Sequence, residues 1–173
     1  MNVQKCSDKA WLLSEEAFNL YAPCMYKPTY QGYKTKIEAY LSDPNIEFFI
    51  CKDDEEIAGI LVLDKQEAEI IGISVSETKR NKGIGRALIE YVMDHERPEQ
   101  LKAQTDDDAI GFYRKCGFVA ERLEIAYPDG VAVRYNCVLK ISYSMQTSIS
   151  CGLTVTANTI SCAIFPYIPT IPS

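Results

Sequence analysis

The chain has 173 residues, which is enough for one domain with a hydrophobic core, and its composition is that of a globular protein. Its formal net charge of −6 argues against the broad basic surface that nucleic-acid binding requires. Seven cysteines without CxxC spacing, and the start "MNVQKCSDKA" without an apolar signal core, favour reduced thiols in a cytoplasmic protein. No apolar run in the sequence is long enough to span a bilayer, so we expect neither nucleic acid nor a membrane as a partner.

Two helices are predicted in the amino-terminal part, and no clear strand is predicted before them. Residues Ala10–Tyr21 place apolar and aromatic side chains at helical spacing, and a second helix is expected over Gly32–Leu41, where "SDPN" ends it. Pro23 and Pro28 break the chain between them. Four tyrosines surround this break: Tyr21, Tyr26, Tyr30 and Tyr33. Packing is the commoner role for such a cluster, and recognition of a partner is the alternative.

The middle of the chain changes to short, apolar, β-rich runs. "IEFFIC", "IAGILVL" and "AEIIGISV", separated by "KDDEE" and "DKQE", predict an antiparallel meander. After the basic segment "KRNKGIGRAL", the stretch "IGRALIEYVMDHER" has helical spacing and stops before Pro98, and "LKAQT" is a brief strand. Because a helix joins the strand before the basic segment to "LKAQT", we expect these two strands to be parallel neighbours.

A short helix and a hairpin are predicted to follow. Asp106 is placed to cap a helix through "DDAIGFYRKC", and Gly117 suits its end. "FVAERLEIAY" and "VAVRYNCVL" flank the turn signal "PDG". The expected fold class is therefore α/β (α+β), with a mixed, mostly antiparallel central sheet that contains one parallel strand pair and is flanked by helices.

Composition divides the chain into residues 1–140 and an extension over residues 141–173. The extension has no charged residue, is rich in Ser, Thr and Ile, and ends in spaced prolines. Three interpretations stay open: a non-catalytic segment, an arm that covers a sheet edge or a second subunit of a homodimer, and an artefact of cloning or reading frame.

The basic segment Lys79–Leu88 is the clearest candidate for a binding site. Its positive side chains surround Gly83 and Gly85 with no acidic residue among them: Lys79, Arg80, Lys82 and Arg86. A Walker loop is absent, and Leu88 stands where the dinucleotide fingerprint needs a small residue. A glycine loop that enters a helix offers backbone N–H groups to an anion such as a diphosphate, although a solvated helix cap has the same pattern.

Two blocks resemble the GCN5-related N-acetyltransferase (GNAT) superfamily. "ISVSETKRNKGIGRAL" is similar to its acetyl-CoA signature R/Q-x-x-G-x-G/A, here Arg80, Gly83 and Gly85. "DDDAIGFYRKCGF" is similar to its later helix motif, here Tyr113 followed by Gly117–Phe118. The blocks occur in the family's order with a strand between them, and the likeness covers roughly residues 46–139.

The resemblance implies acetyl-CoA as cosubstrate, no metal, and a splayed parallel strand pair that admits the cosubstrate between the strands carrying Val75 and Ala103. Main-chain groups of Ile73 and Val75 would contact the pantetheine arm, and the glycine loop would wrap the pyrophosphate. The cofactor-binding residues implied in this way are Ile73, Ser74, Val75, Arg80, Asn81, Lys82, Gly83, Ile84, Gly85 and Arg86. Asp106 is left out because it stands where family members often have Asn, and a carboxylate cannot donate a hydrogen bond as an amide does.

Two residues are expected to carry the catalysis. Tyr113 suits the general acid that protonates the leaving thiolate, because a phenol keeps its proton at neutral pH; its alternative is a core aromatic. Glu69 matches the glutamate that deprotonates lysine in the histone-acetylating branch; its alternatives are an exposed carboxylate and a water chain as base. Strand alternation puts Glu69, Ile71, Ile73 and Val75 on one face unless a bulge resets it.

The expected function is therefore an acetyl-CoA-dependent N-acetyltransferase that moves an acetyl group directly to a primary amine of a small molecule or of a protein or peptide. The alternative is a catalytically inactive CoA-binding interaction module. His95 is expected at the surface, and Cys116 receives no catalytic role because direct transfer needs no protein nucleophile.

Overall fold

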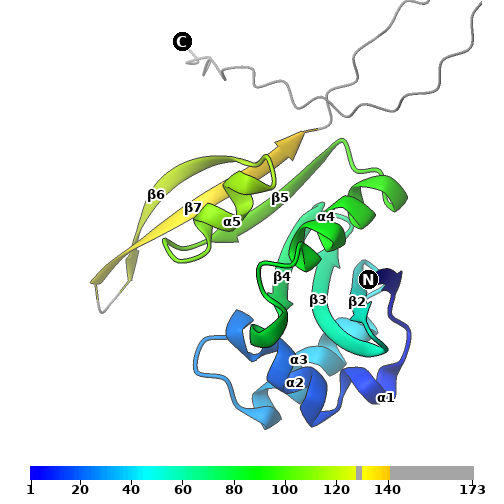
Figure 1. Cartoon of the computed structure of the whole chain (residues 1–173). Helices are drawn as coiled ribbons and strands as arrows, with labels where there is room; N and C mark the ends of the chain where they lie inside the picture. Colours follow the sequence, from blue (N-terminus) through cyan, green and yellow to red (C-terminus); the bar gives the residue numbers. More distant parts are fainter. Residues whose placement is uncertain (128–129, 141–173) are drawn as a thin grey trace, which may run out of the picture.

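A computed structural model describes residues 1–127 and 130–140, and within them the chain forms a seven-stranded sheet in the order β1-β2-β3-β4-β5-β7-β6 (Figure 1). The strands are β1 (Asn2–Lys5), β2 (Ile46–Asp53), β3 (Glu56–Asp64), β4 (Glu69–Val75), β5 (Gln100–Thr105), β6 (Val119–Tyr127) and β7 (Gly130–Lys140). β4 and β5 are parallel and the other neighbours are antiparallel, which confirms the predicted mixed sheet. The predicted extension lies outside the described residues.

Helices flank the sheet. They are α1 (Lys9–Leu12), α2 (Glu15–Tyr21), α3 (Tyr30–Ser42), α4 (Ile84–His95) and α5 (Ile110–Lys115), with 3-10 turns η1 (Ala22–Cys24) and η2 (Glu77–Lys79). In the described part of the chain, no helix is both long and apolar enough to cross a membrane.

The amino-terminal prediction was wrong in two respects. A first strand exists: β1 pairs antiparallel with β2, but its sequence "NVQK" is short and polar and carries no apolar pattern. The predicted helix Ala10–Tyr21 is two helices. The Ser14 hydroxyl caps α2 by accepting a hydrogen bond from the Ala17 N–H at 3.2 Å, so the chain starts a new helix in the middle of the predicted one.

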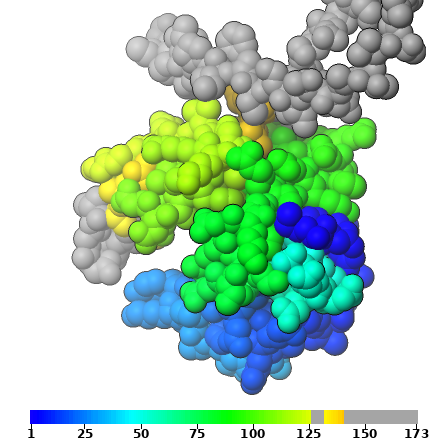
Figure 2. All heavy atoms as spheres, in the orientation of Figure 1, coloured from blue at the N-terminus to red at the C-terminus, as the bar shows by residue number. Residues whose placement is uncertain are grey.

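Two hydrophobic clusters hold the layers together, one on each face of the sheet. Alternate residues of β2 and β3 supply them: Phe49 and Leu61 belong to the cluster with α4 and α5, whereas Phe48 and Ile60 belong to the cluster with α1, α2 and α3. The amino-terminal helices and α4 therefore cover opposite faces. Figure 2 shows the green spheres of α4 and its neighbouring loop between the blue amino-terminal helices and the yellow-green α5 and β6.

β4 contains a bulge that changes which side chains share a face. Val62 of β3 pairs with Gly72, but the next residue, Leu63, pairs with Ile70, so Ile71 is the extra residue. Ile71 packs against the cluster of α1 to α3, whereas Ile73 packs against the cluster of α4 and α5. The bulge thus resets the alternation, so Glu69, Ile71, Ile73 and Val75 do not share one face.

β4 and β5 part after a short paired stretch. Their register pairs are Glu69–Lys102 and Ile70–Ala103, and within the described residues no further pair joins these two strands. The remaining residues of β4 stay paired with β3, while β5 follows β7 along its whole length. Figure 1 shows the two halves of the sheet diverging from this point. We call the opening between the two strands the split.

Candidate functional site

The edge of β4 at the split presents main-chain polar groups. In an antiparallel pair the N–H and C=O of one residue point to the same side, and successive residues alternate. The Ser76 N–H donates to Ala58 O at 2.9 Å, so Ser76 points toward β3. Ile73 and Val75 consequently point away from β3 toward the split. Two side chains already donate to this edge: Cys24 Sγ to Ile73 O at 3.3 Å and Arg80 Nε to Val75 O at 3.4 Å.

A glycine begins the helix that follows this edge. Gly83 is the residue before α4, with φ 84° and ψ 0°, a left-handed conformation that favours glycine. It offers no side-chain cap, so the first N–H groups of α4 have no capping acceptor. A Cβ at Gly83 would meet nothing within 4 Å. The space above the helix terminus is thus open to an anion.

The second glycine of the predicted motif has a packing role. A Cβ on Gly85 would lie 2.9 and 3.0 Å from the ring of Phe112, so the missing side chain lets α5 approach α4. Arg86 reinforces this contact, because its Nη2 donates to Lys115 O at 2.6 Å, at the end of α5. The two glycines therefore have different roles. Gly83 leaves the N-terminus of α4 open, and Gly85 allows close contact between α4 and α5.

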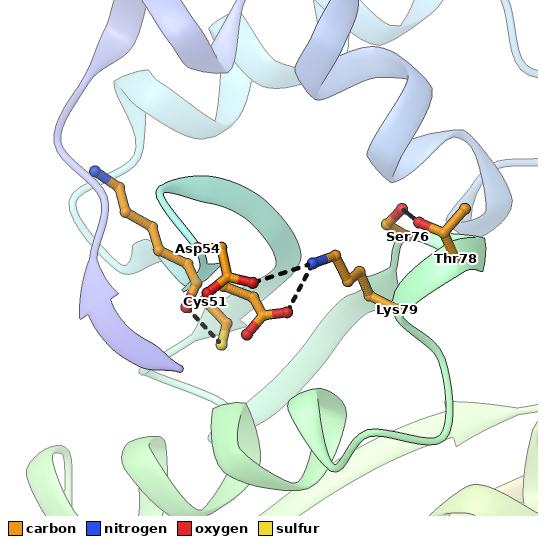
Figure 3. A network of polar contacts seen from close by, with 7 residues as sticks. Cys51, Asp54, Ser76, Thr78 and Lys79 are labelled. Atoms are coloured by element: carbon orange, nitrogen blue, oxygen red, sulfur yellow. Dashed lines mark hydrogen bonds and ion pairs between the residues drawn. The ribbon is translucent and has the colours of Figure 1, made fainter.

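Most of the basic side chains of the loop have partners in the protein. Lys79 Nζ lies 2.8 Å from Asp53 Oδ2 and 4.0 Å from Asp54 Oδ2, which ties η2 to the β2–β3 turn (Figure 3). Arg80 Nη1 lies 3.8 Å from Glu77. Within the described residues, the Lys82 side chain makes no ion pair or hydrogen bond and is exposed. Backbone N–H groups, helped by Lys82, are thus better suited than Lys79 to hold an anion.

Tyr113 lies buried on α5, in the cluster that also contains Ile73 and Val75. Its ring is 5% exposed and makes edge contacts with Phe112 and Phe118, each at 5.2 Å between centroids. Burial raises the pKa of Tyr113 well above its ordinary value, and the nearby Cys24 raises it further. The phenol therefore keeps its proton throughout the neutral range.

The predicted end of α5 at Gly117 is confirmed, but the predicted start is wrong, because α5 begins at Ile110 and its N-cap residue, Ala109, makes no side-chain cap. Asp106 Oδ1 accepts hydrogen bonds from the N–H groups of Asp108 and Ala109 at 3.2 and 3.3 Å, just before the helix, so it caps the turn that leads into α5. Gly117 follows the helix with φ 92°, and its N–H donates to Arg114 O at 3.0 Å. This turn brings Phe118 back against Tyr113.

Glu69 lies at the closed end of the split. Its register partners are Asp64 on β3 and Lys102 on β5, and its side chain is half-buried. Because of the bulge, it faces the side of the sheet opposite to Ile73. Within the described part of the chain, Glu69 forms no hydrogen bond or ion pair, and Lys102 pairs with Glu67 at 3.3 Å instead.

Two residues at the split have no role in the sequence-based prediction. Tyr21, at the end of α2, packs on Gly72, and Cys24 in η1 donates to Ile73 O. Burial raises the pKa of the Cys24 thiol to about 11, so it stays a donor at neutral pH. The cluster of tyrosines around Pro23 was the available signal, and the fold separates it: Tyr21 and Tyr33 are fully buried, whereas Tyr26 is 86% exposed.

His95 is exposed, as expected, and its ring stacks on Tyr91 at 3.8 Å between centroids. Among the residues that the structure describes, there is no group of three or more His, Cys, Asp or Glu side chains that could hold a metal ion.

Comparisons with known proteins agree with this geometry. The model of the acetyltransferase (GNAT) family matches residues 14–118. An uncharacterized N-acetyltransferase in the lysA 3′ region of Bacillus methanolicus is 28% identical over 83 residues, which are 46% of this chain and 68% of that protein.

Solved structures share the fold. A GNAT-family protein from Desulfovibrio desulfuricans is 18% identical with a TM-score of 0.66, and the match covers 82% of this chain and 99% of that one. A GNAT acetyltransferase from Elizabethkingia anophelis, solved with acetyl-CoA bound, is 20% identical with a TM-score of 0.57, over 80% of this chain and 97% of that one. The chain belongs to the acetyltransferase (GNAT) family and is an N-acetyltransferase of that family.

Proposed function

We propose that this N-acetyltransferase transfers the acetyl group of acetyl-CoA directly to a primary amine of a small molecule or of a protein or peptide. The observation that carries the proposal is the split itself. The main-chain edge of Ile73 and Val75 opens there, leads into the Gly83 helix terminus, and lies in the same hydrophobic cluster as the buried phenol of Tyr113.

The residues present fit acetyl-CoA. An extended chain with amide groups, such as pantetheine, can pair with the N–H groups of Ile73 and Val75 as an added strand does, and it would compete with Cys24 and Arg80 for the two carbonyls. The open N-terminus of α4 at Gly83, with the unpaired charge of Lys82 beside it, suits a diphosphate. We therefore propose these residues as the binding site: Ile73, Ser74, Val75, Arg80, Asn81, Lys82, Gly83, Ile84, Gly85 and Arg86.

Within that set the roles differ. Ser74 is buried and Gly85 packs on Phe112, so both would act by shaping the site. Arg80 donates to Val75 O, and a pantetheine amide would compete with it for that carbonyl. Arg86 would support the loop through Lys115 O.

Acetyl-CoA would supply the acetyl group as a thioester, with a thiolate as the leaving group. The protein must then polarise the carbonyl, remove a proton from the amine and return one to the thiolate. The N–H of Ile73 faces the split and suits the first need. Tyr113 is buried and keeps its proton at neutral pH, so it suits the third need, the return of a proton to the thiolate.

For the base we propose Glu69. It is a half-buried carboxylate on β4 without an ion-pair partner in the described residues, at the closed end of the split. Glu69 lies on the face opposite to Ile73, so it would act from the side of the amino-terminal helices. The acceptor can approach from that side while the cosubstrate occupies the side of α4.

The test is turnover of acetyl-CoA by the full chain with a panel of amines: a lysine-containing peptide, a peptide with a free amino terminus, spermidine and an aminoglycoside. Thiol release that depends on one amine, with the acetylated amine found by mass spectrometry, is the expected result. Binding of acetyl-CoA in calorimetry without turnover of any amine would contradict the proposed activity.

We also propose that residues 1–140 are sufficient for the acetyl transfer.

A further inference from the structure

The hydroxyl of Tyr21 is a buried polar group next to the split without a hydrogen-bond partner in the described residues. The side chain is 0% exposed. A Cβ built on Gly72 would lie 2.8 Å from Cε2 and Cζ of the Tyr21 ring, and the hydroxyl oxygen is its nearest atom. The ring therefore extends from α2 across to the main chain of β4, and its hydroxyl ends one residue before Ile73.

The neighbouring tyrosines show how the fold normally satisfies such a group. Tyr33, whose ring centroid is 6.1 Å from that of Tyr21, is equally buried, and its hydroxyl donates to Leu12 O at 2.6 Å. The Tyr30 hydroxyl donates to Leu13 O at 2.7 Å. A phenylalanine at position 21 would fill the same space without leaving a polar atom unpaired. Packing alone thus does not explain a tyrosine at this position.

The surroundings of the hydroxyl indicate what it can bind. Burial, and then the neighbouring Cys24, raise the pKa of Tyr21, so the phenol is neutral and offers one O–H and two acceptor lone pairs. Cys24 donates to Ile73 O, which fixes the segment after α2 against the edge of β4 at this point. A neutral N–H donor that arrives at Ile73 would find an unused acceptor in the Tyr21 hydroxyl.

Resting on the proposed function, we propose that the Tyr21 hydroxyl accepts a hydrogen bond from the acceptor amine and positions its nitrogen beside Ile73. A neutral primary amine has two N–H groups and one lone pair. With one N–H bound to Tyr21, the lone pair is free to form the C–N bond while the C–S bond breaks. The other amine proton goes to the base, and the thiolate receives one from Tyr113. Solvent then carries the proton from the base back to the Tyr113 phenolate, and Tyr21 neither gains nor loses a proton.

The two tyrosines would then act from opposite faces of the sheet. Tyr21 belongs to the cluster of α1 to α3, and Tyr113 belongs to the cluster of α4 and α5. The amine would add to the acetyl carbon from the side of the amino-terminal helices, and the thiolate would leave on the side of Tyr113.

The test compares Tyr21→Phe with Tyr33→Phe in the full chain. Tyr21→Phe should keep or raise the melting temperature, keep the affinity for acetyl-CoA, and lower kcat/KM for the best amine of the panel about three- to tenfold. Tyr33→Phe is the matched control: it removes a satisfied hydrogen bond of the same cluster, so it should lower the melting temperature and leave kcat/KM for that amine unchanged.

Four outcomes overturn the inference. If Tyr21→Phe lowers the melting temperature as Tyr33→Phe does and leaves kcat/KM unchanged, the hydroxyl is structural. If it weakens acetyl-CoA instead of the amine, the hydroxyl acts on the cosubstrate. If the wild-type chain acetylates no amine of the panel, both the proposed function and this inference fail. An active wild type with an equally active Tyr21→Phe variant removes this inference alone.

Discussion

At the scale of single residues, the burial of Tyr113 decides which proton it can carry. Its pKa is raised, so the phenol stays protonated across the range in which an amine acceptor is assayed. Tyr113→Phe keeps the ring between Phe112 and Phe118 and removes only the hydroxyl. We expect kcat to fall about 10²–10⁴-fold, the usual size of general acid–base help, with the Kd for acetyl-CoA nearly unchanged.

The measurement is steady-state turnover from pH 6 to 9 alongside calorimetric titration with acetyl-CoA. Since the hydroxyl does not ionise in this range, the loss should be similar at every pH. A variant as active as the wild type at all these pH values would refute the acid assignment.

Glu69 should leave a different signature. As a base it accepts a proton from the amine, so loss of its carboxylate should cost most activity at the pH values where the amine is still protonated. Glu69→Gln should lower the rate near neutrality and recover in part at high pH, as a lysine-like amine with a pKa of about 10.4 loses its proton unaided. An unchanged profile would assign the base to water or to another residue.

Single residues of the site were predictable only where a motif specifies them. Local sequence patterns specify the loop from Arg80 to Arg86 and, separately, Tyr113. Such patterns can be recognised without knowledge of the tertiary structure. The pairing of Lys79 with Asp53 was not predictable, because Asp53 lies 26 positions away, at the end of β2. The same holds for Cys24, whose acceptor Ile73 is 49 positions away.

At the scale of elements, the start of α4 gives the sharpest test of anion binding. Asp and Asn both tolerate the left-handed conformation of Gly83 better than other residues, and a side chain there meets nothing within 4 Å. Gly83→Asp and Gly83→Asn therefore differ mainly in charge. We expect Gly83→Asp to bind acetyl-CoA more than tenfold more weakly than Gly83→Asn in calorimetry at low salt. Equal affinities of the two variants would exclude a diphosphate at this helix terminus.

Helices and strands were predictable where their own apolar pattern determines them, and not where pairing between strands does. Helix α4 and the three middle strands follow from apolar periodicity. The bulge at Ile71 arises from the register of β4 on β3, and no residue type in "AEIIGISV" signals it. It nevertheless decides which face Glu69 occupies. The break at Ser14 was also hidden, since the flanking apolar residues fit one helix as well as two.

The contact between α2 and the bulge can be tested through Gly72. A Cβ there would collide with the ring and hydroxyl of Tyr21, so Gly72→Ala should lower the free energy of unfolding by about 1–3 kcal/mol, as overpacking does. Gly111→Ala is the control, because a Cβ there meets nothing within 4 Å. Urea unfolding of both variants gives the comparison, and a Gly72→Ala variant as stable as Gly111→Ala would show that Tyr21 moves freely.

At the scale of the whole molecule, the sheet is held together differently in its middle and at its β1 edge. The split divides β4 from β5, while the polar strand β1 stays on β2 partly through charge. Glu47 of β2 is 6% exposed, and its Oε1 lies 2.5 Å from Lys5 Nζ and 2.6 Å from Lys65 Nζ. This buried carboxylate thus joins β1 to the chain that follows β3.

The last prediction concerns the stability that Glu47 confers and its pH dependence. Burial by itself would raise the pKa of Glu47, but hydrogen bonds and charges of Lys5 and Lys65 outweigh it, and the pKa lies below its ordinary value. A group whose pKa is lowered by folding stabilises the protein fully above its unfolded value, about 4.3, and loses that contribution as pH falls through the folded value.

Glu47→Gln should therefore lower the free energy of unfolding at pH 7 by about 1.5–3 kcal/mol, the range for hydrogen bonds to charged groups. The difference from wild type should begin to shrink below about pH 4.3, where the unfolded chain takes up a proton, and it should be lost only below the lowered pKa of the folded chain, where both states are protonated. Glu67→Gln serves as control, because the Glu67–Lys102 pair is exposed and such pairs contribute little. Urea midpoints of the three proteins, measured stepwise from pH 7 down to pH 2, give the comparison. A difference for Glu47→Gln that stays the same over this whole range would show that its effect comes from packing instead of charge.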